Sequence, residues 1–315
     1  MTVLVTGGTG FIGSHVVRRL VGQGREVVAL DISPNPENLR EAKDKVRVVR
    51  GDVLDIVNLT DVIKRNHMDQ IVHLAYMLTV ASRENPQLAL KVNCLGNNNV
   101  LEAARTTDVK RVVWASSLSV YGGDERYSDQ PVDEETPIHI THGGVYGGCK
   151  ILNEIMGRHY RAAYGLDNIG LRFSGIYGPG RAPTGKGAAT AYWSSVIENP
   201  ALGKPVRVPY VDDRYAFLYV KDAAKAIDLA LEARGLQHMI FNICGSVHSF
   251  REIIDIVRRI IPDAIIETEP GTSRTPLLYS MERARLELGY EPTYDLETGI
   301  RDFVDEVRRY AQKRA

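Results

Sequence analysis

The sequence has few features that would direct it to a membrane, a nucleic acid or an oxidising compartment. Its three cysteines, Cys94, Cys149 and Cys244, are an odd number without metal-ligand spacing, which favours free thiols in a reducing compartment and no metal site. Lys and Arg together number 39, as do Asp and Glu, so no net charge draws the chain to nucleic acid. No apolar run approaches the roughly 18 residues of a membrane span, and no basic, apolar leader is present. We therefore expect a cytoplasmic protein with a small-molecule partner and no nucleic-acid or membrane partner.

The first recognisable pattern covers residues 2–21, where a β-branched run, a glycine-rich turn and an apolar-periodic stretch follow one another. This order predicts a strand, a phosphate-binding loop and a helix. Gly7 allows the tight turn out of the strand, Gly10 lets the backbone approach a pyrophosphate, and Gly13 lets the helix pack against the sheet. A side chain at Gly10 would stand where the phosphate must lie. The pattern therefore predicts a dinucleotide site.

A second predicted strand, 26–30, ends in Asp31. An acidic residue at this distance from the glycines accepts a hydrogen bond from the adenosine ribose 2′-hydroxyl. Ile32 follows Asp31, and no Arg or Lys stands directly after it to hold a 2′-phosphate. The carboxylate would repel that phosphate, so we predict NAD rather than NADP.

Asp52 follows the strand predicted at 46–50. At the carboxyl edge of a parallel sheet, its carboxylate could accept a hydrogen bond from an adenine amino group. It could instead cap the helix predicted at 55–65. The sequence leaves both interpretations open.

Two further segments fit the same site. Ala75 ends the strand predicted at 71–75, and its small side chain would let the dinucleotide lie against the backbone. Asn93 lies in a long helix predicted at 85–105, among apolar positions. We therefore predict that its side chain ties this helix to the active-site strand.

Strands predicted at 110–116 and 169–173 continue a regular alternation of strands and helices. This alternation predicts an α/β fold with a Rossmann-type doubly wound parallel sheet. The alternation becomes less regular afterwards, which predicts a smaller C-terminal α/β lid over the carboxyl edge. The expected units are an NAD-binding domain of residues 1–173 with 215–246, and a substrate-binding domain of residues 174–214 and 247–315.

Ser117, Tyr146 and Lys150 are the candidate catalytic residues. Tyr146 and Lys150 are four residues apart in a predicted helix at 143–164, which places the phenol and the ammonium on one face. A secondary alcohol that loses a hydride must also lose its hydroxyl proton, and a phenolate favoured by a neighbouring cation can accept it. Ser117, at a strand end, could donate a hydrogen bond to the substrate oxygen. Cys149, directly before Lys150, we interpret as a buried thiol rather than a reactive one.

The chain resembles an extended short-chain dehydrogenase/reductase of the NAD-dependent epimerase/dehydratase family over nearly its whole length. The segments that carry the resemblance are 6–13, Asp31, 52–53, 73–75, Asn93, 116–117, 120–122, 146–150, 177–179 and 219–220. The resemblance implies that NAD contacts Gly7, Gly10, Phe11, Ile12, Gly13, Asp31, Ile32, Asp52, Val53, Leu74, Ala75, Asn93, Tyr146, Lys150 and Phe173. It also implies a homodimer formed through the helices predicted at 85–105 and 143–164.

Departures from the family pattern bear on the substrate. Nucleotide-sugar enzymes of the family usually carry Arg-x-x-Asn before Tyr-Gly-Pro, whereas the run from Arg172 here places Gly175 at the Asn position. They commonly carry Arg-Asp-Phe before the Tyr-Val strand, whereas here Arg214 precedes Tyr215-Ala216-Phe217. The 4,6-dehydratases carry Asp-Glu where this chain has Leu118-Ser119, which disfavours dehydration.

Two functions remain open at this point. The first is an oxidoreductase that moves a hydride between NAD and a secondary alcohol of a small polyhydroxylated or hydroxy-acid substrate. Segments 85–89 and 292–296 resemble the threonine 3-dehydrogenase branch, but that branch's tryptophan has no counterpart around 277–281. The alternative is a UDP-sugar 4-epimerase with tightly bound NAD, whose diphosphate could meet Arg172, Arg181, Arg207, Arg214 and Arg274. The candidate substrate residues are Ser119, Gly175, Arg181, Arg214 and Arg274.

Overall fold

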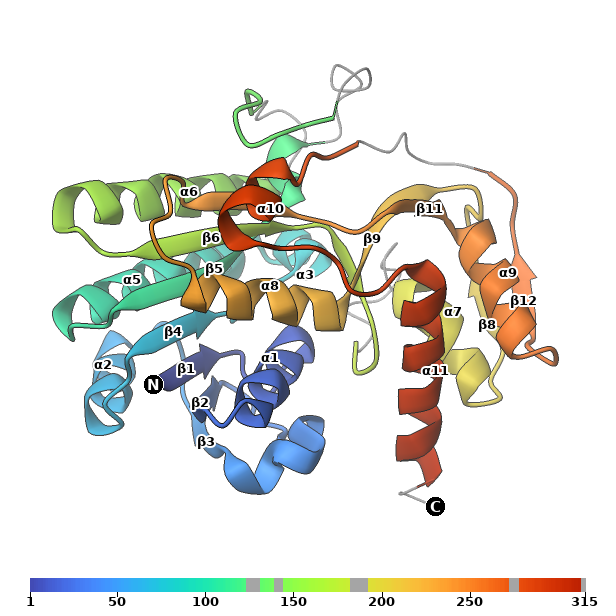
Figure 1. Ribbon diagram of the computed structural model, residues 1–315, viewed down its shortest axis with the longest axis horizontal. Helices are drawn as coiled ribbons and strands as arrows, with labels where there is room; N and C mark the ends of the chain where they lie inside the picture. The colour runs from blue at the N-terminus through green and yellow to red at the C-terminus, as the bar shows by residue number, and fades with distance from the viewer. Residues whose placement is uncertain (123–130, 139–143, 182–191, 272–277, 313–315) are drawn as a thin grey trace.

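A computed structural model describes residues 1–122, 131–138, 144–181, 192–271 and 278–312. Its central feature is a sheet of seven strands, all parallel, in the order β10-β6-β5-β4-β1-β2-β3 (Figure 1). The strand order reverses between β1 and β4, so the crevice at their carboxyl ends is where a doubly wound sheet binds its ligand. The predicted Rossmann-type α/β fold is confirmed. The strands are β1 (Thr2–Thr6), β2 (Glu26–Asp31), β3 (Arg47–Arg50), β4 (Gln70–His73), β5 (Arg111–Ser117), β6 (Asn168–Phe173) and β10 (Ile240–Ile243).

Helices cover both faces of this sheet, and alternating side chains of each strand feed two separate cores. In β1, Val3 and Val5 pack into the core under α1 and α8, whereas Leu4 packs into the core under α2, α5 and α6. This two-residue period is what a parallel strand buried on both faces requires. The covering elements are α1 (Phe11–Gly22), η1 (Pro36–Lys45), α2 (Ile56–Arg65), α3 (Thr79–Glu84), α5 (Gly96–Thr106), α6 (Gly144–Tyr164) and α8 (Val220–Glu232).

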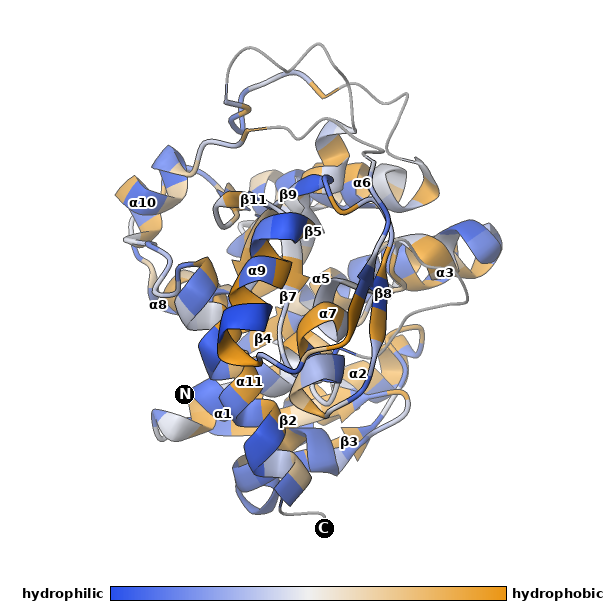
Figure 2. Cartoon of the chain, turned by 90° about the vertical axis from the view of Figure 1, so that its right-hand side faces the viewer, coloured by the Kyte–Doolittle hydropathy of each residue, from blue (hydrophilic) through white to orange (hydrophobic). Residues whose placement is uncertain are grey.

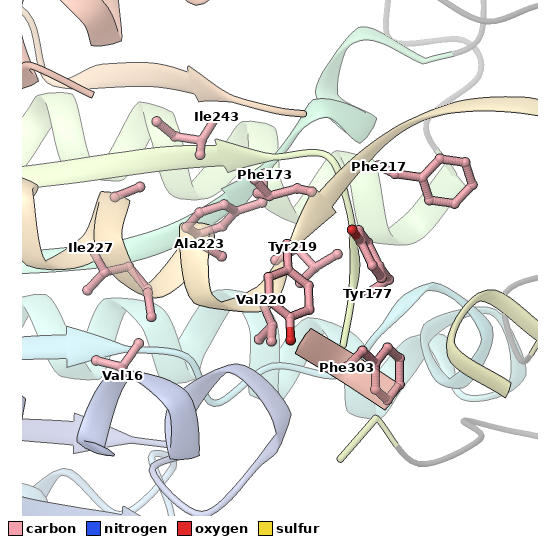
Figure 3. Packing of buried hydrophobic residues seen from close by; sticks show 14 of the residues in the cluster. Val16, Phe173, Tyr177, Phe217, Tyr219, Val220, Ala223, Ile227, Ile243 and Phe303 are labelled. Atoms are coloured by element: carbon pink, nitrogen blue, oxygen red, sulfur yellow. The ribbon is translucent and has the colours of Figure 1, made fainter. Parts of the chain in front are cut away.

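The C-terminal part contains two small sheets, β11-β9-β7 and β12-β8, and the helices that pack around them. Figure 2 shows this part facing the viewer, with hydrophilic and hydrophobic residues alternating along α9 and α11. The larger core runs without a break from Val16 and Phe173 to Tyr177, Tyr219 and Phe303 (Figure 3). The elements are β7 (Gly175–Tyr177), α7 (Tyr192–Ala201), β8 (Val206–Val208), β9 (Arg214–Tyr219), β11 (Val247–Ser249), α9 (Phe250–Ile260), β12 (Ile266–Thr268), α10 (Glu282–Leu288) and α11 (Leu296–Gln312).

The helix predicted at 85–105 differs from a plain α-helix in the structure. It consists of α4 (Pro86–Ala89), a π-helical stretch η2 (Leu90–Leu95) and α5, and a short helix, α3, precedes it. The strands β7, β11 and β12 were not predicted, because each has only three residues and forms through pairing with distant strands. Within the described ranges, no helix is both long and apolar enough to cross a membrane.

Candidate functional site

The glycine-rich loop folds back on itself at the carboxyl end of β1. Gly7 has a φ of +66°, which favours glycine, and a Cβ at Gly13 would lie 2.0 Å from the Gly7 carbonyl oxygen. Gly10 precedes α1, and no side chain in the described part of the chain caps that helix, so its first N–H groups are available to an anion. Gly8, to which we had assigned no role, packs against β2, since a Cβ there would lie 2.8 Å from that of Ala29.

Asp31 is held in place at the end of β2 by the phosphate loop itself. Its Oδ2 accepts hydrogen bonds from Thr9 Oγ1 at 2.8 Å and from the Thr9 N–H at 3.2 Å. Its Oδ1 accepts from the Ser33 N–H at 3.2 Å. The next side chain, Ile32, is 60% exposed. Sequence reasoning missed Thr9. It lies in the loop after β1 and Asp31 ends β2, so no short-range sequence pattern indicates their contact.

The structure excludes one of the two interpretations of Asp52 and leaves the adenine contact a prediction. The helix α2 is capped by Asp55, whose Oδ1 accepts from the Asn58 N–H at 2.9 Å. The capping role proposed for Asp52 is therefore wrong, because the helix begins three residues later than that role requires. Asp52 Oδ1 accepts from the Leu54 N–H at 2.9 Å, and the neighbouring Val53 is buried in the core.

Asn93 ties the helix after α3 to the segment that follows β4 and carries Leu74 and Ala75. Its Oδ1 accepts from the Met77 N–H at 2.7 Å, and its Nδ2 donates to the Met77 carbonyl at 3.0 Å. The Asn93 carbonyl in turn accepts from Asn153 Nδ2 of α6 at 3.0 Å. The predicted tie is present, and it reaches the backbone just beyond the strand.

Ser117, Tyr146 and Lys150 lie together at the carboxyl edge of the sheet. Ser117 ends β5, its Oγ donates to Ser119 Oγ at 3.0 Å, and it is near enough to Tyr146 on α6 to lower the pKa of that phenol. Lys150 Nζ lies 5.5 Å from the centre of the Tyr146 ring and donates to the Ala115 carbonyl at 2.5 Å. Phe173 ends β6 beside Ser117 in the strand register.

The electrostatics of this group differ from the prediction. Burial raises the pKa of Tyr146 to about 12, and the Ser117 hydrogen bond and the Arg181 guanidinium act in the opposite direction. Burial lowers the pKa of Lys150 well below its usual range. We expected Lys150 to favour the phenolate. The cation that does so is Arg181, because the Lys150 ammonium lies against the Ala115 carbonyl and the face of Tyr76, 3.0 Å from the ring centre.

Tyr76 is a site residue that sequence reasoning missed. Its ring lies between Lys150 and the ring of His73, whose centre is 4.4 Å away, and its hydroxyl donates to Asn97 Oδ1 at 2.7 Å. The available signal was a tyrosine directly after Ala75, where a small residue had been expected to face the dinucleotide. Tyr76 holds the Lys150 ammonium by a cation–π contact.

Arg181 is half-buried and lies near both the phosphate-loop residue Phe11 and the catalytic phenol. Its guanidinium lies 5.7 Å from the centres of both the Phe11 and the Trp193 rings, and it donates to the Ile176 carbonyl. Burial lowers the pKa of Arg181 to about 10, and the Tyr146 phenol opposes that shift. Among the residues that the structure describes, no carboxylate pairs with Arg181. A guanidinium without a carboxylate partner is available to bind an anion such as a carboxylate or a phosphate.

The other candidate substrate residues have different surroundings. Ser119 lies beside α6, where a Cβ at Gly147 would come within 2.8 Å of its carbonyl oxygen. Gly175 faces the Trp193 indole, and a Cβ there would lie 1.7 Å from Cζ3, so no larger residue fits. Arg214 is exposed at the start of β9. Arg274 lies outside the described residues.

Arg172 does not belong to the site. Its side chain is 1% exposed and forms a two-pronged ion pair with Glu154, which is 2% exposed. The suggestion that Arg172 holds a substrate diphosphate is therefore wrong, because the guanidinium is turned into the interior between β6 and α6.

Three features lie at the carboxyl edge of the parallel sheet: a glycine-rich loop before α1, the acidic residue Asp31 at the end of β2, and the neighbouring Ser117, Tyr146 and Lys150. Together they are typical of an extended short-chain dehydrogenase/reductase. The chain belongs to the NAD dependent epimerase/dehydratase family, whose model matches residues 3–244. NAD is the cofactor.

Relatives with different activities cover the chain almost completely. The UDP-glucose 4-epimerase of Mycolicibacterium smegmatis is 31% identical, over 99% of this chain and 100% of its own. The structure of UDP-glucose 4-epimerase from Thermus thermophilus with NAD is 30% identical, with a TM-score of 0.82 over 98% of this chain and 99% of that one. The GalE-like L-threonine dehydrogenase from Cupriavidus necator is 25% identical, with a TM-score of 0.85 over 98% of this chain and 100% of that one. The family is thus shared by proteins of both reaction types that the sequence left open.

Proposed function

We propose that the chain is an NAD-dependent dehydrogenase that exchanges a hydride between NAD and a secondary alcohol carrying a carboxylate, such as a hydroxy acid. The observation that supports this is Arg181. It is a half-buried cation without a carboxylate partner in the described part of the chain, and it lies within electrostatic reach of Tyr146. A substrate carboxylate at Arg181 would bring the adjacent hydroxyl towards the phenol.

The cofactor fits the residues present. We place its pyrophosphate at the uncapped N-terminus of α1, near Phe11 and Ile12, where backbone N–H groups and the helix dipole favour an anion. Asp31 is positioned to accept from the adenosine ribose. When bound, NAD supplies the hydride acceptor.

Each of the three catalytic side chains has its own role in the reaction. Ser117 donates a hydrogen bond to the substrate oxygen and Tyr146 accepts the hydroxyl proton. Lys150 is fixed behind the phenol by the Ala115 carbonyl and the Tyr76 ring. Arg181 favours the phenolate. Loss of the proton from the hydroxyl oxygen and of a hydride from the carbinol carbon converts the secondary alcohol to a ketone.

The second candidate is a UDP-sugar 4-epimerase. The UDP-glucose 4-epimerases that match almost the whole chain favour it. In this case NAD would stay bound through each turnover, and Arg181 would meet an anionic group of the nucleotide sugar. The close fit of Gly175 against Trp193 argues against it, because no amide side chain fits at that position.

The first experiment measures nucleotide released from extensively desalted protein. An empty site that binds added NAD reversibly, with NADH formed from one member of a hydroxy-acid panel, supports the dehydrogenase. Stoichiometric NAD that survives desalting, together with UDP-sugar interconversion and no NADH release, supports the epimerase and refutes our proposal.

The Tyr146→Phe variant tests the chemistry. We expect it to lower turnover by about a hundredfold to ten-thousandfold while NADH binding persists, because only the proton acceptor is lost. Tyr164→Phe, at the exposed end of the same helix, is the matched control and should keep full activity. Equal activity of Tyr146→Phe and the wild type would contradict the assigned role.

We also propose that the protein forms a homodimer. The support is a set of exposed apolar side chains on the neighbouring helices α4, η2 and α6. Large exposed apolar patches mark association surfaces. The residues of this patch are Leu88, Leu90, Leu95, Val145, Leu152, Ile155 and Tyr164.

A cytoplasmic location of the protein stays a prediction.

A further inference from the structure

His15 lies on the phosphate-loop helix α1, one turn after Phe11, and its side chain reaches the segment that carries Arg181. His15 is 4% exposed, and its Nε2 lies 3.0 Å from the Pro179 carbonyl oxygen. Its ring also packs edge-on against the Phe11 ring, with 6.1 Å between the two centres. One buried side chain is therefore the neighbour of both the phosphate loop and the segment that leads to Arg181.

The partners of the imidazole determine which of its nitrogens carries the proton. A carbonyl oxygen only accepts hydrogen bonds, so Nε2 is protonated and donates to Pro179. A guanidinium only donates, so Nδ1 accepts from Arg18 Nη2 at 2.7 Å. The longer contact of the same Nη2 with Nε2, at 3.0 Å, joins two donors and adds no hydrogen bond. Arg18 Nη1 in turn donates to Glu306 of α11 at 3.0 Å, which holds the guanidinium in place.

The backbone around Pro179 depends on side chains from elsewhere for its position. The flanking Gly178 and Gly180 have φ angles of +151° and +89°, in the region that favours glycine, and glycine has wide conformational freedom. The Gly178 N–H donates to Ser194 Oγ at 3.3 Å, and the Pro179 carbonyl accepts from His15. Loss of the His15 bond would therefore leave this carbonyl without its side-chain donor and loosen the turn.

Arg181 makes a second contact between this segment and the phosphate loop. Its guanidinium lies 5.7 Å from the centre of the Phe11 ring and donates to the Ile176 carbonyl. Phe11 is the first residue of α1, where the N–H groups are available to an anion. Together with the His15 bond, this contact joins α1 to residues 179–181 at two points. Order in the first turn of α1 and order in residues 179–181 should thus stabilise each other.

We propose that His15 is a positioning residue, whose hydrogen bond couples cofactor binding at α1 to the order of residues 178–181 and so places Arg181 for the substrate. This inference rests on the pyrophosphate position and on the role of Arg181 proposed above. The first turn of α1 becomes ordered when its N–H groups hold the pyrophosphate. His15, one turn along, then holds the Pro179 carbonyl in one position. By linkage, the coupling also strengthens cofactor binding by the same factor.

Hydrogen exchange measured by mass spectrometry tests this coupling without any substrate. Full-length protein is compared with and without saturating NADH, in peptides that cover residues 2–20 and 174–181. In the wild type we expect NADH to slow exchange in both regions. His15→Phe keeps an aromatic ring but has no donor. In this variant NADH should still protect residues 2–20, whereas residues 174–181 should exchange about two- to tenfold faster than in the wild type, the effect of one lost hydrogen bond.

Two polar variants separate the hydrogen bond from the volume of the side chain. The amide nitrogen of glutamine reaches about as far as the imidazole Nε2, so His15→Gln should restore the protection of residues 174–181 and the NADH affinity. Asparagine is shorter, so His15→Asn should behave like His15→Phe, with NADH affinity lowered by about two- to tenfold. A role in packing alone would instead leave His15→Phe closest to the wild type. If His15→Phe folds poorly, His15→Asn and His15→Gln still provide the comparison.

The possible failures give different results. Protection of residues 174–181 that is equal in all variants, or absent in a wild type whose residues 2–20 are protected, would overturn the coupling. Wild-type protein that binds NADH without protection of residues 2–20 would overturn the pyrophosphate position and the coupling with it. A wrong substrate proposal would appear only as a lack of turnover, because none of these measurements depends on turnover.

Discussion

The ionisation of the Tyr146 phenol depends on neighbours that act in opposite directions. Burial disfavours the phenolate, whereas the Ser117 hydrogen bond and the Arg181 guanidinium favour it. Because phenolate is the form that accepts the substrate proton, oxidation of the alcohol should accelerate as the pH rises through the pKa of Tyr146. Arg181 lowers that pKa and therefore moves the rise towards neutral pH.

Replacing Arg181 by glutamine should displace this pH profile. Removal of the cation raises the pKa of Tyr146, so the rise in kcat/KM for oxidation should move to higher pH by about one unit. The measurement is the pH profile of kcat/KM with NAD saturating. Arg207→Gln is the matched control, since Arg207 is 69% exposed on β8 and pairs with Glu269. An unshifted profile in Arg181→Gln would refute the electrostatic link.

Two elements are joined behind the site by a buried ion pair. Arg172 of β6 donates to the Glu154 carboxylate of α6 through Nε at 2.8 Å and through Nη2 at 2.7 Å. Ser116, next to the catalytic Ser117, donates to the same carboxylate at 2.7 Å. The pair thus fixes α6, which carries Tyr146 and Lys150, against the strand ends.

The Glu154→Ala variant should be strongly destabilised. It leaves the Arg172 guanidinium buried without its counter-charge, which costs about 3–5 kcal/mol of unfolding free energy. Urea unfolding measures this loss. The control is Glu282→Ala, which breaks the exposed pair with Arg285 and should leave the free energy of unfolding almost unchanged. A cost below about 1 kcal/mol for Glu154→Ala would contradict the buried pair's role.

These elements also show what sequence could and could not predict. The apolar periods located β1, α1 and α6, and helical spacing placed Tyr146 and Lys150 on one face, because these signals are local. The contacts of Thr9 with Asp31 and of Arg172 with Glu154 join elements that are separate in the sequence. The spacing of the residues along the chain therefore does not predict these contacts. The strand β7 has three residues and is stabilised by β9, far along the chain.

At the scale of the whole molecule, a charged network connects the phosphate-loop helix to the C-terminal helix. Glu306 of α11 accepts hydrogen bonds from Arg18 at 3.0 Å and from Arg40 at 2.7 Å. His15, beside Arg18, is hydrogen-bonded to the Pro179 carbonyl at 3.0 Å, two residues before Arg181. Burial lowers the pKa of His15 to about 3, so it is neutral at physiological pH. Through this chain of contacts, α1 and α11 set the position of the segment that carries Arg181.

The other feature at this scale is the apolar patch on α4, η2 and α6, which pack against one another. Burial of each large side chain there contributes about 1.5–3 kcal/mol, so one charge at its centre should prevent association. Light scattering should give a dimer mass for the wild type and a monomer mass for Ile155→Glu. Leu286→Glu, at a 68% exposed position on α10, should remain dimeric. A monomeric wild type, or a dimeric Ile155→Glu, would show that this patch does not form the interface.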